Sequence, residues 1–172
     1  MRELLLAFLQ SPSRDTYLAV RGALISSPDY EPYSRDILDV ADRIEEERFI
    51  DADELLRASM PNLLLSPRAH LYGAMIAEQA GDEERRRMEG AVAYACVQGI
   101  LATGDGTKQH PYVVTRTSDE YDVMQFLEKE IEGQSLHEEG GRHYDLLRSK
   151  DGSEMWFDVT DPYRRLGDQL DQ

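Results

Sequence analysis

Apolar residues recur at helical spacing through the N-terminal part of the chain, and this pattern predicts a series of short helices. The first two helices are predicted at residues 2–10 and 14–26. Pro12 ends the first of them because it lacks a backbone donor, and Ser13 is a suitable N-cap for the second. Arg21 falls between the apolar positions of the second helix, so we expect it at the margin of the buried stripe.

Two helical hairpins are predicted between residues 34 and 103. The first begins with Ser34 as its N-cap and ends before Pro61, and the second begins after Pro67 and turns at Gly81-Asp82. Their helical spacing predicts a core that contains Leu55, Leu56, Leu71, Met75, Val92 and Cys96.

The segment from Ser66 to Asp82 reads like the first helix and turn of a tetratricopeptide hairpin. The turn near residues 47–51 precedes the turn at Gly81-Asp82 by about 34 residues, which is the length of that repeat unit. Arg86 stands where the motif has a small residue. Residues 1–103 are therefore predicted as a tetratricopeptide-like helical region, and stacked hairpins of this kind present a surface to another protein.

The composition changes at Gly104, and residues 104–172 are predicted as a small α/β segment. Residues 112–117 are β-rich, and one short helix begins at Ser118. Three further strands are predicted at 131–138, 142–149 and 154–160 with tight turns between them. This order predicts an antiparallel meander. The fold class is therefore α+β, with helical hairpins packed against a small antiparallel sheet in one cooperative unit.

A two-residue turn at Asp151-Gly152 would place Asp145 directly opposite Asp158 on one polar face of the sheet. His143 shares that face, with Glu138 opposite it. A histidine among carboxylates can bind a divalent metal or transfer a proton. Acidic faces of exposed sheets are usually only solvated, so we assign no metal and no catalytic residue here.

The charge balance bears on the kind of partner. The chain carries 34 acidic and 19 basic residues and a net charge of -15, which disfavours nucleic acid and membrane surfaces. The acidic surplus is compatible with a basic protein or peptide as the partner, and equally with a role in solubility alone. Gly104-Asp-Gly-Thr107 follows a helix and lacks the ending of a phosphate loop, so no cofactor is expected. Cys96 is the only cysteine, and no signal peptide or anchor is indicated, so a cytoplasmic location is expected.

Several short motifs resemble an uncharacterised bacterial family of degenerate tetratricopeptide-like helices followed by a small α/β segment. The similarity covers residues 29–166 and includes Asp119-Glu-Tyr-Asp122, Gln134-Ser-Leu136 and Trp156-Phe-Asp158. It implies no activity. The positions that it implies as a candidate functional surface, to which the predicted sheet face adds Asp158, are Asp105, Tyr121, Gln134, Ser135, His143, Tyr144, Asp145 and Asp158.

These observations favour a non-enzymatic protein interaction module that binds a basic protein or peptide. One alternative is an inhibitor or immunity-type protein for a cationic toxin, whose capture an acidic surface would accelerate. The other alternative is a small hydrolase or metal-dependent enzyme that uses the polar sheet face. The sequence does not determine the oligomeric state.

Overall fold

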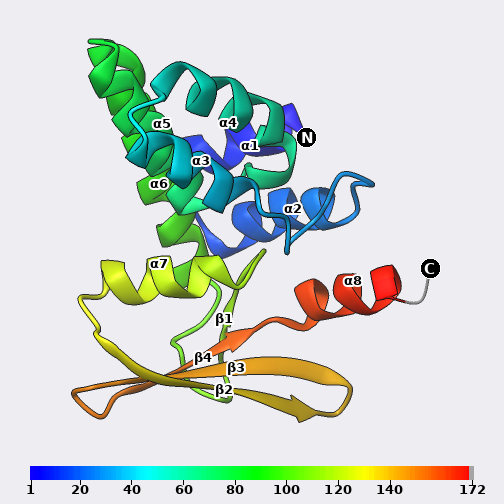
Figure 1. The fold of residues 1–172 in the computed structure, drawn as a ribbon. Helices are drawn as coiled ribbons and strands as arrows, with labels where there is room; N and C mark the ends of the chain where they lie inside the picture. Colours follow the sequence, from blue (N-terminus) through cyan, green and yellow to red (C-terminus); the bar gives the residue numbers. More distant parts are fainter. Residues whose placement is uncertain (171–172) are drawn as a thin grey trace.

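The computed structural model describes residues 1–170, with side-chain surroundings through Gly167, and has the α+β class expected from the sequence. Figure 1 shows the N-terminal helices on one side of the molecule and a small sheet on the opposite side, with one helix between the two layers. The last two residues of the predicted α/β segment, 171–172, lie outside the described part. The N-terminal helices are α1 (Arg2–Gln10), α2 (Arg14–Ile25), α3 (Asp36–Glu45), α4 (Phe49–Leu63), α5 (Pro67–Gln79) and α6 (Glu83–Leu101).

The cap of α2 is the expected one, and Asp82, which was expected in the turn, caps α6. Ser13 accepts from the backbone N–H of Thr16 in a capping box, and Asp82 accepts from the backbone N–H of Arg85. The expected N-cap at Ser34 is wrong, because α3 begins two residues later and the Ser34 hydroxyl instead donates to Asp36.

The expectation that α4 ends before Pro61 is also wrong, since Pro61 lies inside its last turn. The next residue, Asn62, is held by hydrogen bonds to the backbone of Glu31 and to Ser34. Tertiary contacts therefore extend the helix beyond the point that proline alone would set.

The buried face of α5 differs from the expected one. Leu71 and Met75 were expected in the core but are exposed, whereas His70, Gly73 and Ile76 are buried. The close packing of α5 on α6 explains this rotation: a Cβ at Gly73 would lie 3.0 Å from Glu89, and His70 Nδ1 lies 2.7 Å from the Glu89 carboxylate. Of the other residues expected in the core, Leu56 and Cys96 are buried, and Leu55 and Val92 are half-buried.

The C-terminal part forms a four-stranded sheet with the order β1-β4-β3-β2. Its strands are β1 (Tyr112–Val113), β2 (Ile131–Glu139), β3 (Arg142–Ser149) and β4 (Glu154–Asp158). Strands β2, β3 and β4 form the expected antiparallel meander. Strand β1 pairs with β4 in parallel, so the sheet is mixed and not wholly antiparallel.

The expected register of β3 and β4 is wrong by one residue. Asp145 lies opposite Phe157, and Asp158 lies opposite Tyr144, because Ser149 pairs with Ser153 and leaves a three-residue loop instead of two. Gly152 ends that loop at a φ of +84°, which favours glycine. A register shift of one residue places Asp145 and Asp158 on opposite faces of the sheet, so the two aspartates do not form a pair.

Two helices accompany the sheet, where the sequence predicted one. Helix α7 (Ser118–Phe126) is the expected one, although the Ser118 side chain does not cap it. Helix α8 (Thr160–Leu170) begins where a strand was expected to end, and Asp158 accepts from the backbone N–H and hydroxyl of Thr160. Pro162 stands in the first turn of α8, where its missing donor costs no helical hydrogen bond.

One hydrophobic cluster joins the helices to the sheet. It includes Phe8 and Tyr17 from the first two helices and Leu147 and Phe157 from the sheet, all fully buried. A second cluster around Leu56 and Ile76 lies among α3, α4 and α5. No helix in the described part of the chain is long and apolar enough to cross a bilayer.

Two side chains of α2 and one from the loop between α2 and α3 donate to three consecutive backbone carbonyls beside the sheet. The Tyr17 hydroxyl donates to the carbonyl of residue 113 at 3.2 Å, and the Tyr30 hydroxyl donates to that of residue 115 at 2.5 Å. Arg21 donates twice to the carbonyl of residue 114, at 2.9 and 3.0 Å, and forms an ion pair with Asp161. Arg21 is therefore buried at this junction and not at the margin of the helix stripe, as the sequence had suggested.

We predict that the helices and the sheet unfold in one transition, because the first cluster draws on both. Trp156 is the only tryptophan and lies in β4, so its fluorescence follows the sheet, whereas far-ultraviolet circular dichroism follows mainly the helices. The two signals should have the same midpoint in urea. Separate midpoints would show that the two parts unfold independently.

Replacing Tyr30 by Phe should destabilise the protein by about 1–3 kcal/mol, because a buried carbonyl loses its donor. The matched control is Tyr33→Phe, since that ring is more exposed and its hydroxyl makes no hydrogen bond among the described residues; about 0.5 kcal/mol or less is expected there. Chemical denaturation measures both. Equal effects would contradict a special role for the Tyr30 hydroxyl.

Candidate functional site

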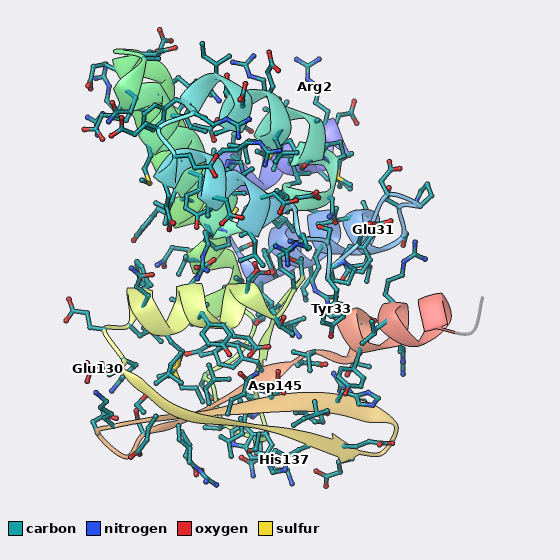
Figure 2. The ribbon with its side chains drawn as sticks, in the orientation of Figure 1. Arg2, Glu31, Tyr33, Glu130, His137 and Asp145 are labelled. Atoms are coloured by element: carbon teal, nitrogen blue, oxygen red, sulfur yellow. The ribbon has the colours of Figure 1, made fainter. Side chains whose placement is uncertain are left out.

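The structure places the predicted functional residues in separate groups. Three of them, Tyr121, Gln134 and Asp145, are linked by hydrogen bonds between α7 and the sheet. The Tyr121 hydroxyl donates to Gln134 Oε1, and Gln134 Nε2 donates to Asp145 Oδ2 at 2.8 Å. Figure 2 shows Asp145 on the side of the sheet that faces the helices and His137 on the far side.

The other predicted positions have different surroundings. Ser135 bonds to His137 on the far face of the sheet, and Asp105 accepts from Thr107 in the loop after α6. His143 stacks on Tyr163 of α8 with ring centroids 4.5 Å apart.

Tyr144 and Asp158 belong to the far face of the sheet as well. Arg142 lies over the Tyr144 ring and pairs with Asp158. The expected combination of His143, Asp145 and Asp158 is therefore not assembled. Among the described residues, no group of three or more histidine, cysteine or acidic side chains is arranged to hold a metal.

Glu120 is the central residue that the sequence interpretation missed. Glu120 lies on the side of α7 that faces the sheet, where its side chain is fully buried, and its Oε2 atom lies 3.4 Å from Gln134 Nε2. Burial raises the pKa of Glu120 to about 10, and the charge and hydrogen bond of Asp145 act in the same direction. Burial also raises the pKa of Asp145, while Gln134 and Glu120 oppose that shift. At neutral pH this pair therefore holds a proton on Glu120.

A sequence signal for Glu120 was available. Glu120 lies at helical spacing from Val123, Met124 and Leu127, so it continues the apolar stripe of α7 toward the sheet. A carboxyl group on an apolar stripe becomes buried, and a buried carboxyl group is either protonated or paired with another polar group. Its position on the stripe therefore distinguishes Glu120 from an acid that is exposed to solvent.

The other acids of α7 are also buried. Asp119 accepts from Thr115 and from the backbone of Arg116, and burial raises its pKa to about 7. Asp122 Oδ1 accepts from two nitrogens of Arg68 at 2.7 and 2.8 Å. Burial raises the pKa of Asp122, and Arg68 opposes that shift. Helix α7 is therefore tied to its surroundings through its acidic side chains.

An apolar groove of about 270 Å³ lies between α5, α6 and α7. Its floor includes Ala93 and Val97, and large exposed side chains rise around it: Leu71 is 47% exposed and Tyr94 is 58% exposed. The Tyr94 ring lies 5.9 Å from that of Phe126, which is also exposed. Leu71, one of the residues expected in the core, thus contributes to an outer surface.

Comparison with known proteins gives no relative from which a function can be transferred, because no family model, no curated protein and no solved structure matches the chain.

Glu120→Gln should change the pH dependence of stability. Because the folded pKa of about 10 lies above the ordinary value of 4.5, the wild type loses stability as pH rises between those values. The variant should gain up to about 1.4 kcal/mol per pH unit relative to wild type between about pH 5 and 9. Chemical denaturation at several pH values measures this difference.

The matched control is Glu139→Gln, at an exposed position whose pKa is lowered by Lys108. Glu139 is ionised in both folded and unfolded chains above about pH 5, so its variant should differ from wild type by a constant amount. A constant difference for Glu120→Gln as well would show that Glu120 is ionised in the folded protein.

Proposed function

We propose that this protein is a non-enzymatic interaction module that binds a short amphipathic segment of a basic partner in the groove between α5, α6 and α7. The observation that carries the proposal is the convergence of large exposed apolar side chains from three helices on one concave surface. Single exposed apolar residues are common, but a contiguous set around a groove is typical of a binding surface.

The groove suits apolar side chains of a partner. Leu71, Tyr94 and Phe126 come from three different helices, and each is exposed at the groove. Aromatic side chains at such positions contribute strongly to binding, because they lose much water-exposed area with little conformational entropy.

Charge supports a basic partner. Asp122 is the acidic residue of the groove lining, which includes no basic residue; its Oδ1 atom pairs with Arg68, and its Oδ2 atom is buried without a hydrogen-bond partner among the described residues. The net charge of -15 would also attract a cationic segment at long range. A segment with apolar residues on one face and lysine or arginine beside them matches both features.

The test uses a synthetic amphipathic helix of leucine and lysine and a matched helix of leucine and glutamate. Fluorescence anisotropy should show saturable binding of the basic peptide that weakens as salt rises, and much weaker binding of the acidic peptide. Leu71→Lys should weaken the binding of the basic peptide by about tenfold or more, because the substitution removes an apolar contact and adds a like charge.

The matched control is Leu38→Lys, which makes the same change at an exposed leucine of α3 outside the groove. It should reduce binding only slightly, through the change in net charge. Equal loss in both variants would place the peptide elsewhere, and equal binding of the two peptides would contradict electrostatic recognition.

A further inference from the structure

A second pocket, of about 400 Å³, lies between α3 and the N-terminal end of α7. Its size falls in the range of pockets that hold small molecules. Ile37, Leu38 and Tyr33 form an apolar wall, and Arg68 and Arg116 are its basic residues. These two arginines are far apart in the sequence, so the basic site arises only from the fold and was not visible as a charged run.

Arg116 is the unusual residue of this pocket. It is 3% exposed, and its guanidinium makes a single hydrogen bond among the described residues, from Nη2 to the carbonyl of Glu31 at 3.1 Å. No carboxylate of the described residues forms a salt bridge with it, although Asp119 and Asp36 act on it at longer range. The other buried arginine, Arg21, has both a carbonyl and Asp161 as partners.

The Nε and Nη1 donors of Arg116 make no hydrogen bond among the described residues and are not fully enclosed, so they are available to an anion in the pocket. The chain has 34 acidic residues and 19 basic ones, yet none of the described acidic residues forms a salt bridge with Arg116. The position of Arg116 on a pocket wall, without such a partner, points to a ligand as the missing anion.

Further donors lie around the same pocket. Ser118 lines it, and the Ser118 Oγ atom is buried without a hydrogen-bond partner among the described residues. Thr117 and Ser118 begin α7, whose N-terminal end favours negative charge. Arg68 uses Nε and one Nη atom on a single oxygen of Asp122. The two guanidinium groups, the hydroxyls and the helix end together offer more hydrogen-bond donors than one carboxylate can accept. The three oxygens of a phosphate can accept them.

The acids behind the pocket do not present full negative charge to it. Glu120 lies next to Tyr121, which lines the pocket, and burial keeps Glu120 protonated at neutral pH because its pKa is raised to about 10. The Glu120–Asp145 pair therefore carries one negative charge instead of two. The acids closer to the two arginines are Asp122, which pairs with Arg68, and Asp119 and Asp36, which act on Arg116 at longer range.

We propose that the pocket between α3 and α7 binds a small phosphate monoester, with Arg116, Arg68 and Ser118 around the phosphate and the apolar wall around an aromatic or aliphatic body. This binding site lies outside the groove of the proposed function and does not depend on it.

Isothermal titration calorimetry with phenyl phosphate tests the site. The wild type should bind phenyl phosphate saturably, and it should bind inorganic phosphate and benzoate each at least about tenfold more weakly. The first comparison measures the apolar wall, and the second measures the phosphate group. Arg116→Gln should weaken the binding of phenyl phosphate by at least about tenfold.

A second variant keeps the test decisive if Arg116→Gln does not fold. Leu38 is 52% exposed on the pocket wall, so Leu38→Glu adds a like charge beside the phosphate without changing the core, and it should also abolish binding. Leu6→Glu is the matched control, because Leu6 is 48% exposed on α1 and lines neither site, and it should leave phenyl phosphate binding unchanged.

Saturable binding that is lost in Leu38→Glu and kept in Leu6→Glu supports the site. No saturable binding to wild type, or unchanged binding in Leu38→Glu, overturns it. Benzoate binding as tight as phenyl phosphate overturns the assignment of phosphate.

Discussion

The position of the sheet depends on three side chains, two from α2 and one from the loop after it, that donate to consecutive backbone carbonyls. Strand β1 has only two paired residues, so one edge of the segment after Tyr112 is held by β4 and the other by Tyr17, Arg21 and Tyr30. Buried carbonyls without donors are costly, and these donors remove that cost only in one relative placement of the helices and the sheet. Apolar packing alone would allow many placements, because it is not directional.

This placement determines where α7 lies, and α7 separates the two candidate sites. Figure 1 shows α7 between the helical layer and the sheet. One side of α7 contributes Asp122 and Phe126 to the apolar groove, and its N-terminal end contributes Ser118 to the basic pocket. The third side buries Glu120 against Asp145. A nine-residue helix would not be stable alone, so its position rests on these contacts.

Local patterns predicted most elements, while features that depend on tertiary contacts were missed. Ser13, Gly81 and Asp82 act within one turn, so their roles followed from the sequence. The register of β3 and β4 depended on one residue in the loop at Gly152. The exposure of Leu71 depended on how closely α5 approaches α6. Residues that are distant in sequence, such as Arg68 and Arg116, meet only in the folded chain.

Arg68 connects the two proposed sites. It lines the basic pocket, and its guanidinium holds Asp122, which lines the apolar groove. A phosphate that draws Arg68 away from Asp122 would leave that carboxylate with less positive charge beside it, and a basic segment in the groove would then bind more tightly. Coupling of this kind is reciprocal, since each ligand must strengthen the other by the same factor. The ion pair between Arg68 and Asp122 would therefore couple ligand binding at the two proposed sites.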